Sequence, residues 1–341
     1  MSRINTISEF LLHAGTDYRI FDMGRAIRPL SSQTFLDFEL NHISAPYPRQ
    51  QHAWFGLVFF NKGLSQEQYI WFVKLPLDEQ GKLISAARNQ FLHIVVEALG
   101  AEMEKSHNAK QGLPENPFTF VPKQSQLASF NSLTRQKLAL APSQYLEFAE
   151  QYLRSPQNTD WQQLSLQGIA DLTAKISEAP THDLVIQQFS NLAPEVQMAL
   201  CDALENHPVS TRLGERLIDE WRRKGKEPSY LIAILRALSQ SDDEAQITQL
   251  LIDVLQQDNL VTHDLLILIS ARHWQKLQDQ QVLTLFIQRL SSAPIELFTG
   301  LFRDLVQIPD CREIMLNVLR WPEKEPALVL RISTLFETQS R

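Results

Sequence analysis

The sequence of 341 residues has only two cysteines and 11 glycines, and it has no long apolar run. Cys201 and Cys311 have no CxxC motif and no partner at metal-ligand spacing. We therefore expect two reduced thiols in a cytoplasmic protein, because free cysteine behaves as a small buried hydrophobe. Apolar runs such as 54–60 are far shorter than the roughly 18 residues that a membrane span requires. No signal-peptide pattern is expected at the amino terminus.

The sequence has no excess of positive charge, and acidic side chains outnumber basic ones in the second half of the chain. Residues 1–150 carry 14 basic and 14 acidic side chains, whereas residues 151–341 carry 18 and 25, so the net charge of −7 belongs entirely to the second half. This balance disfavours binding to nucleic acid or to an anionic membrane, because both need a basic surface.

The first half of the chain mixes helical and β-type patterns. An amphipathic helix is expected over 6–13, and Gly15 ends it by supplying a left-handed residue. A strand follows over 18–21. Ser31 and Ser32 can then cap a second helix.

Two further strands are expected over 53–60 and 68–75, because both segments are rich in aromatic and β-branched residues. Their connection is longer than a tight hairpin turn. A helix over 84–103 carries an apolar stripe with the 3.6-residue period, so it should cover one face of a small antiparallel sheet. Arg88 and His93 lie off that stripe and are expected to face solvent.

A stretch rich in proline and glycine then separates the two halves. Helical patterns resume after it and continue to the end of the chain. The sequence therefore predicts three parts: a small α+β domain over 1–104, a linker and connecting helix over 105–141, and a helical repeat domain over 142–341.

Helix starts recur at nearly constant spacing in the second half. They fall at Asp160, Pro194, Pro228, Thr262, Pro294 and Pro326, which are 34 or 32 residues apart. Proline is favoured in the first helical turn, where its missing N–H would be unsatisfied anyway. Two sets of residues align when the chain is compared with itself at this period. The first set is Ala203, Ala237 and Ala271, and the second is Leu217, Leu251 and Leu285. The first repeat fits worst, because its second helix should begin near Thr181.

Repeats of two helices cannot bury their apolar surface alone, so stacking them predicts a helical-hairpin array. The period matches tetratricopeptide repeats, but their Leu-Gly pattern is missing because Ser165 follows Leu164. We therefore expect a HEAT-like α-solenoid, with a compact multi-helix domain as the alternative. The concave side of the solenoid would be a platform for a protein partner.

Motifs for known chemistry are missing. The sequence contains no GxGxxG, GxxxxGK[ST], HExxH, GxSxG or EF-hand loop. His93 and Glu97 are spaced as helical metal ligands but have no third ligand nearby. A Cys201–His207 dyad would need the fold to bring the two side chains together. We therefore expect no catalytic residue, no metal and no cofactor.

Six polar side chains of the first half lie close to the expected strand ends, where loops often carry sites. They are Asp22, Arg25, Arg28, His52, Lys74 and Asp78. If this half binds a small ligand, Asp22, Arg25, Lys74 and Asp78 should converge in a concave pocket. The alternative is structural: an Asp–Arg pair orders its turn, and Asp78 favours the dipole of the following helix.

The densest basic run in the second half comprises Arg222, Arg223, Lys224 and Lys226 around Gly225. It could bind an anionic partner. Cations also favour the negative end of a helix dipole, and Gly225 suits a helix C-cap, so a structural role is the alternative.

Two strings of the first half, 18–25 (YRIFDMGR) and 71–81 (WFVKLPLDEQG), resemble an uncharacterised family of gammaproteobacterial proteins of similar length, a domain of unknown function. The resemblance implies a bacterial cytoplasmic protein with no established activity. It supplies no catalytic residues to carry over.

Two functions are consistent with these patterns. The first is a non-enzymatic scaffold or adaptor that binds a protein partner through the helical array. The alternative is a small-ligand-binding or enzymatic α+β domain that the array regulates. Leu328, Leu330 and Leu335 are expected to be exposed on the last repeat, where they would cap the array or form a homo-oligomer.

Overall fold

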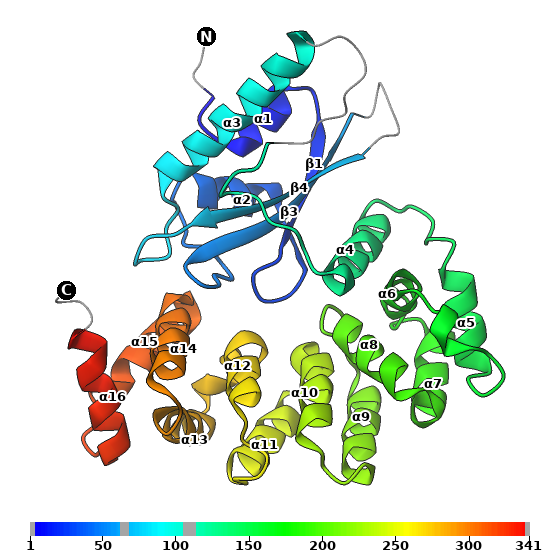
Figure 1. Ribbon diagram of the computed structural model, residues 1–341, viewed down its shortest axis with the longest axis vertical. Coiled ribbons are helices and arrows are strands. Elements are labelled where there is room, and N and C mark those ends of the chain that lie inside the picture. The colour runs from blue at the N-terminus through cyan, green and yellow to red at the C-terminus, as the bar shows by residue number, and fades with distance from the viewer. Residues whose placement is uncertain (1–3, 62–67, 105–113, 338–341) are drawn as a thin grey trace. The chain divides into compact units, whose positions relative to one another are not determined.

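The computed structural model describes residues 4–61, 68–104 and 114–337. The expected connection over 62–67 and the linker segment 105–113 lie outside the described residues. The chain divides into two compact units, one formed by 1–122 with 307–309 and the other by 123–306 with 310–341. Each unit is described below by itself (Figure 1).

The α+β unit contains a four-stranded antiparallel sheet with the strand order β2-β1-β3-β4. Its strands are β1 (Asp17–Asp22), β2 (Arg28–Leu30), β3 (His52–Phe60) and β4 (Gln68–Pro76). Three of the four strands agree with the sequence prediction. The short strand β2 was not predicted, because three residues centred on a proline carry too little β pattern to be recognised.

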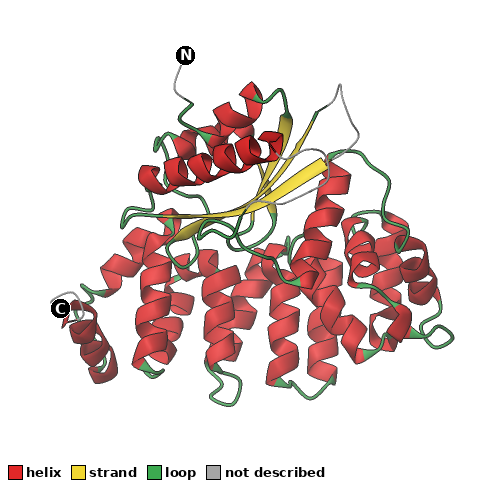
Figure 2. Cartoon of the chain, turned by 45° about the horizontal axis from the view of Figure 1, so that its top comes forward, coloured by secondary structure: helices red, strands yellow, loops and turns green. Residues whose placement is uncertain are grey.

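Three helices cover one face of this sheet, as Figure 2 shows: α1 (Ile7–His13), α2 (Ser32–Glu39) and α3 (Ser85–Glu104). Alternate residues of β3 point toward them, so Phe55 and Leu57 are completely buried. The Phe35 ring of α2 packs edge-on against Phe55, with 5.0 Å between ring centroids. Phe91 of α3 makes a similar contact with Trp71 of β4.

A buried carboxylate joins the helices of this layer. Glu39 of α2 is fully buried and accepts hydrogen bonds from the backbone N–H groups of Ile7 and Ser8 and from the Ser8 hydroxyl. Burial raises the pKa of the Glu39 carboxyl despite these bonds. Arg88 of α3 donates to the Glu39 carbonyl oxygen. Arg88 is thus buried, contrary to the expectation that it faces solvent, because this backbone acceptor holds it between helices.

Every helix or strand element named in the described residues of the second unit is helical. Short 3-10 turns separate some of its helices, which are α4 (Gln124–Lys137), α5 (Leu146–Arg154), α6 (Leu166–Ala174), α7 (Ala179–Gln188), α8 (Pro194–Leu204), α9 (Thr211–Arg223), α10 (Pro228–Ala237), α11 (Glu244–Leu255), α12 (His263–Arg272), α13 (Gln280–Ser291), α14 (Ile295–Gln307), α15 (Pro309–Val318) and α16 (Pro326–Glu337). None of the helices in the described part of the chain combines the length and apolar character that a bilayer crossing requires.

Helices two places apart in the chain pack on one another. One row runs through α4, α6, α8, α10 and α12, and a second row contains the contacts of α5 with α7, α7 with α9, and α11 with α13 (Figure 1). The α5–α6 crossing is close because α6 has a glycine there: a Cβ on Gly168 would lie 2.6 Å from the Tyr145 carbonyl oxygen.

The predicted period is visible in the central helices. The first helices of three successive hairpins begin at Pro194, Pro228 and His263, and Thr262 caps the last of them with its side chain. Ala203 and Ala237 are buried at equivalent positions, and Ala271 is half-buried.

The period is irregular at both ends of this unit. Asp160 caps a 3-10 turn, and α6 itself begins only at Leu166. At the other end, α16 packs on α13. Leu328 and Leu335 are buried, contrary to the expectation that they are exposed, because they belong to the inner face of α16; Leu330 is 61% exposed.

Polar contacts connect neighbouring hairpins at the same period. Arg236 of α10 pairs with Asp202 of α8, 34 residues earlier, and Arg289 of α13 donates to the Leu255 carbonyl oxygen, also 34 residues earlier. These bonds fix the register in which the hairpins stack.

Candidate functional site

The first predicted cluster surrounds a buried carboxylate at the end of β1. Asp22 lies opposite Arg28 in the β1–β2 pairing, and its Oδ1 accepts the Gly24 N–H at 2.8 Å. Its Oδ2 is buried and has no hydrogen-bond partner among the described residues. Burial raises the pKa of Asp22 to about 7, although the Gly24 bond and the positive charges of Arg28, Arg25 and Arg49 all lower it.

The turn after Asp22 is held against a neighbouring segment. A Cβ on Gly24 would lie 2.1 Å from the Tyr47 carbonyl oxygen, so only glycine fits there. The guanidinium of Arg28 lies over the Tyr47 ring at 4.7 Å. Arg25 is buried.

His52 and Lys74 belong to a second cluster, which is built around Trp54. Lys74 pairs with Trp54 across β3 and β4, and its ammonium lies 5.7 Å from the indole centroid. Arg49 stacks on the same indole at 4.1 Å. The His52 ring lies 6.1 Å from it, and His52 Nδ1 is 2.8 Å from the Gln50 carbonyl oxygen.

Asp22 and Lys74 point to opposite faces of the sheet. Asp22 pairs with Phe55 and Lys74 with the adjacent residue Trp54, and neighbouring residues of a strand face opposite sides. Asp78 is separate again: its Oδ1 accepts the backbone N–H groups of Gln80 and Lys82 in an exposed turn before α3. The expected convergence of Asp22, Arg25, Lys74 and Asp78 in one pocket is therefore wrong.

The basic run lies at the C-terminal end of α9, and most of its cations have partners there. Arg222 pairs with Asp219, and Arg223 forms two hydrogen bonds with the buried carboxylate of Glu220. Lys224 donates to Gln197 and lies 4.2 Å from the Tyr230 ring centroid.

Lys226 adopts a left-handed backbone conformation just after Gly225, which has the same conformation. Three of the four cations thus stabilise the end of α9 and its contacts with neighbouring helices.

The two thiols are buried. Burial raises the pKa of Cys201 to about 12, and the charges that act on this thiol belong to Asp202, Lys224 and Arg236. Burial also lowers the pKa of His207 to about 4. His207 is not among the groups that shift the thiol pKa, and burial outweighs the lowering by Lys224 and Arg236, so Cys201 remains protonated. In the described part of the chain, no three histidine, cysteine or carboxylate side chains are grouped as metal ligands.

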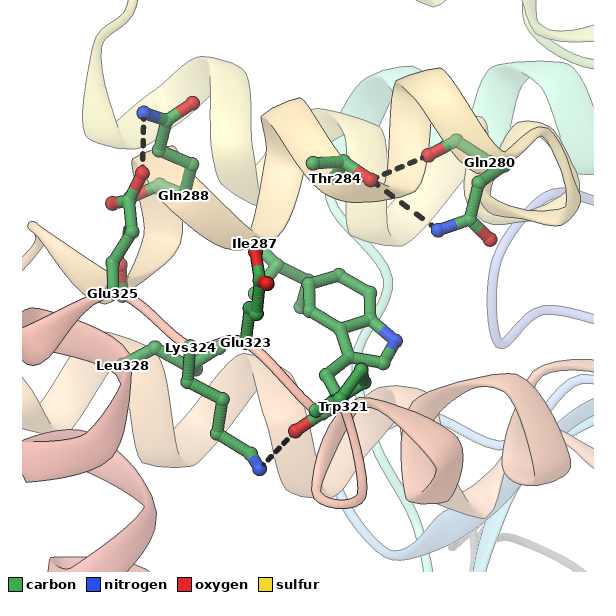
Figure 3. A pocket seen from close by; sticks show the side chains of 11 residues that line it. Gln280, Thr284, Ile287, Gln288, Trp321, Glu323, Lys324, Glu325 and Leu328 are labelled. Carbon is green, nitrogen blue, oxygen red and sulfur yellow. Dashed lines mark hydrogen bonds between the residues drawn. The ribbon is translucent and has the colours of Figure 1, made fainter.

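A cavity of about 600 Å³ lies within the helical unit, between α13 and the segment that leads from α15 into α16. Figure 3 shows Gln280, Thr284, Ile287 and Gln288 on the α13 side, with Trp321, Glu323 and Leu328 opposite. Glu325 accepts a hydrogen bond from Gln288 Nε2 at 3.0 Å, which connects the two walls. We call this the α13–α16 cavity.

The α13–α16 cavity was not predicted from the sequence. It exists because 319–325 interrupts the repeat: the tryptophan-proline pair at 321–322 ends the helical pattern, and the chain crosses to α13 before α16 begins. A Trp-Pro pair between Arg320 and Glu323 is the only local signal, and its position beside α13 depends on tertiary packing.

Comparison with known proteins gives one match. The family profile described as "Protein of unknown function (DUF3549)" matches residues 2–336. No curated protein and no solved structure matches the chain significantly. The match extends over both units and both clusters described above, and the chain therefore belongs to the DUF3549 family.

Proposed function

We propose that this protein is a non-enzymatic interaction scaffold, and that its helical unit is an α-solenoid that binds a protein partner. The observation that carries the proposal is the packing of each first helix, from α4 to α12, on the first helix of the next hairpin. Stacked helical hairpins present one long row of equivalent helix surfaces, and repeat proteins use such rows to bind partners.

An exposed apolar ladder supports this assignment. Met198 of α8, Ile232 of α10 and Ile267 of α12 each occupy the fifth position of their helix. Met198 is 41% and Ile267 is 43% exposed, and Ile232 is half-buried. Three apolar side chains that recur once per hairpin on one row of helices form a periodic stripe, whereas scattered exposed hydrophobics need no explanation.

The chemistry of the α+β unit favours a supporting role. Its polar candidates divide between the Asp22 turn, the Trp54 cluster and the Asp78 turn, and they do not converge around one space. Catalysis would need groups held within reach of one reacting atom. A second function in this unit therefore has no specific observation in its favour.

Photo-crosslinking from the full-length chain tests the scaffold proposal. A benzophenone amino acid replaces Met198, Ile232 or Ile267 in three separate variants, and the crosslinks formed in gammaproteobacterial cells are identified by mass spectrometry. We expect the same protein to be captured from at least two of the three ladder positions.

Matched control variants carry the photoreactive residue at Leu12 or Val96 of the α+β unit, which are 60% and 54% exposed. These positions should not capture the same protein. Capture only from Leu12 or Val96, or from no position at all, would contradict a partner site on the first-helix row.

A further inference from the structure

The α13–α16 cavity combines an aromatic wall with a carboxylate that has no partner. Trp321, Ile287 and Leu328 supply its apolar surface. In Figure 3, Trp321 and Glu323 project from the 321–325 segment toward α13. Glu323 is exposed and has no hydrogen-bond or ion-pair partner among the described residues.

Among the described residues that line the cavity, the one cation is Lys324. The Lys324 ammonium donates to the Trp321 carbonyl oxygen and points away from α13 (Figure 3). Glu325 is held by Gln288, and its second carboxylate oxygen remains available at the rim. The lining therefore presents two carboxylates, an indole and one lysine that keeps its charge but is directed away from α13, which leaves a net charge of −1.

We infer that the α13–α16 cavity binds an arginine side chain from an extended segment of the partner protein. A guanidinium is planar, so it can stack on the Trp321 indole and present its N–H fork to the Glu323 carboxylate at the same time. A volume of about 600 Å³ exceeds that of one side chain and leaves space for a flanking apolar residue against Leu328. This inference rests on the proposed scaffold function, because it names the chemistry of the partner.

Charge supports the choice of a basic segment. The carboxy-terminal half of the chain holds 25 acidic and 18 basic side chains, but residues 280–337 around the cavity hold seven and six, so the attraction for a basic segment comes from Glu323 and Glu325 themselves. An acidic or phosphorylated segment would be repelled by Glu323 and Glu325.

Methyl NMR of the full-length protein tests the arginine site directly. Ile287 lines the cavity, so its δ1 methyl resonance reports occupancy. The probe is the tripeptide acetyl-Leu-Arg-Leu-amide, and its neutral isostere carries citrulline in place of arginine. We expect the arginine tripeptide to shift the Ile287 resonance saturably, with a dissociation constant near 1 mM, which is about −4 kcal/mol. The citrulline tripeptide should bind at least roughly 5-fold more weakly.

Two variants locate the interaction. Glu323→Gln removes the charge at an exposed position and should weaken binding roughly 5-fold without affecting folding. Glu215→Gln removes an exposed charge from α9, outside the cavity, and should leave the affinity unchanged. Trp321→Leu should abolish the response to the tripeptide, and unchanged δ1 methyl resonances of Ile252 and Ile269, which lie on α11 and α12 away from the cavity, would show that the helical unit stays folded.

The outcomes separate this inference from the scaffold proposal. An Ile287 resonance that does not respond to the arginine tripeptide, or that responds equally to the citrulline form, overturns the arginine site even if the ladder crosslinks to a partner. A specific response together with no crosslinked protein supports the arginine site and contradicts the scaffold.

Discussion

Arg236 and Asp202 are 34 residues apart in the sequence, and their Nη1 and Oδ1 atoms are 2.7 Å apart in the structure. The pair connects α10 to α8 and repeats the period of the helix starts. Both side chains are about one third exposed. An ion pair of this kind contributes at most about 1 kcal/mol to stability, so it sets the register of the hairpins more than it holds them together.

Arg272 makes a stronger connection between hairpins. Its Nε lies 2.8 Å from Oε2 of Glu205, and both side chains are largely buried. Arg272→Met should lower the free energy of unfolding by about 3 kcal/mol, because it leaves a buried carboxylate short of its main partner. Urea denaturation of the full chain measures this loss. Asp202→Asn is the matched control, because it breaks the partly exposed Arg236–Asp202 pair and leaves both cations beside Glu205 in place; it should cost about 1 kcal/mol. Equal losses would mean that burial does not distinguish the two pairs.

Glu39 stabilises the start of α1 from a different helix. Glu39→Ala should destabilise the protein by about 2 kcal/mol, because the Ile7 and Ser8 donors lose their buried acceptor. Hydrogen exchange at the Ile7 and Ser8 amides should accelerate in parallel. Glu97→Ala, at an exposed position of α3, is the control and should change neither quantity. Normal protection of the two amides in Glu39→Ala would refute the capping role.

Asp22 should make the protein more stable at mildly acidic pH. Its pKa is raised from 3.8 to about 7 in the folded chain, so the folded state holds a proton that the unfolded state releases. The free energy of unfolding therefore falls as the pH rises from about 4 to about 7, and it is constant above that range. Between pH 5 and pH 8 the loss from Asp22 is on the order of 2 kcal/mol.

Asp22→Asn removes this titrating group and keeps an oxygen for the Gly24 N–H. Urea denaturation at pH 5 and pH 8 should therefore give a variant that gains stability, relative to the natural chain, as the pH rises. A constant difference between the two proteins across this range would show that Asp22 titrates normally.

Two buried histidines act in the opposite direction. Burial lowers the pKa values of His207 and His273 from 6.5 to about 4, so the unfolded state binds protons that the folded state excludes. Their contribution to stability is complete above pH 6.5 and is lost as the pH falls toward about 4. Replacing both with glutamine should make urea midpoints less sensitive to acid over this range. An unchanged acid sensitivity would contradict the neutral state of these rings.

Neither cysteine should react while the protein is folded. Cys201 and Cys311 are buried, and the pKa of Cys201 is raised to about 12. A chromogenic disulfide reagent at pH 8 should release no signal until urea unfolds the chain, and then it should report two thiols. Rapid reaction of either thiol in the native protein would show an opening of the helical core.

The parts of the fold that were predicted correctly carry local signals. Pro194 and Pro228 begin helices, and Thr262 caps one, because these residue types satisfy the first helical turn from the sequence itself. The strands around Trp54 and Trp71 were recognisable from their aromatic and β-branched composition. Strand β2 lacked such a signal, because it depends on pairing with β1.

The candidate sites were harder to predict because their geometry is not local. Strand alternation places Asp22 and Lys74 on opposite faces, and this depends on a register that the sequence does not specify. The α13–α16 cavity requires Ile287 and Trp321, which are 34 positions apart in the sequence, to lie side by side, and no motif predicts this.

The contacts of Glu205 affect how the helical unit unfolds under force. Repeat arrays with contacts only between neighbours can lose their terminal hairpins one at a time. Arg272 of α12, however, reaches Glu205 across 67 residues and bypasses the hairpin of α10 and α11, whose Ser239 and Gln240 bond the Glu205 carbonyl oxygen. Glu205 at the end of α8 thus contacts both the α10–α11 hairpin and α12. A pulling force applied to the chain ends should therefore unfold these helices together in a single step.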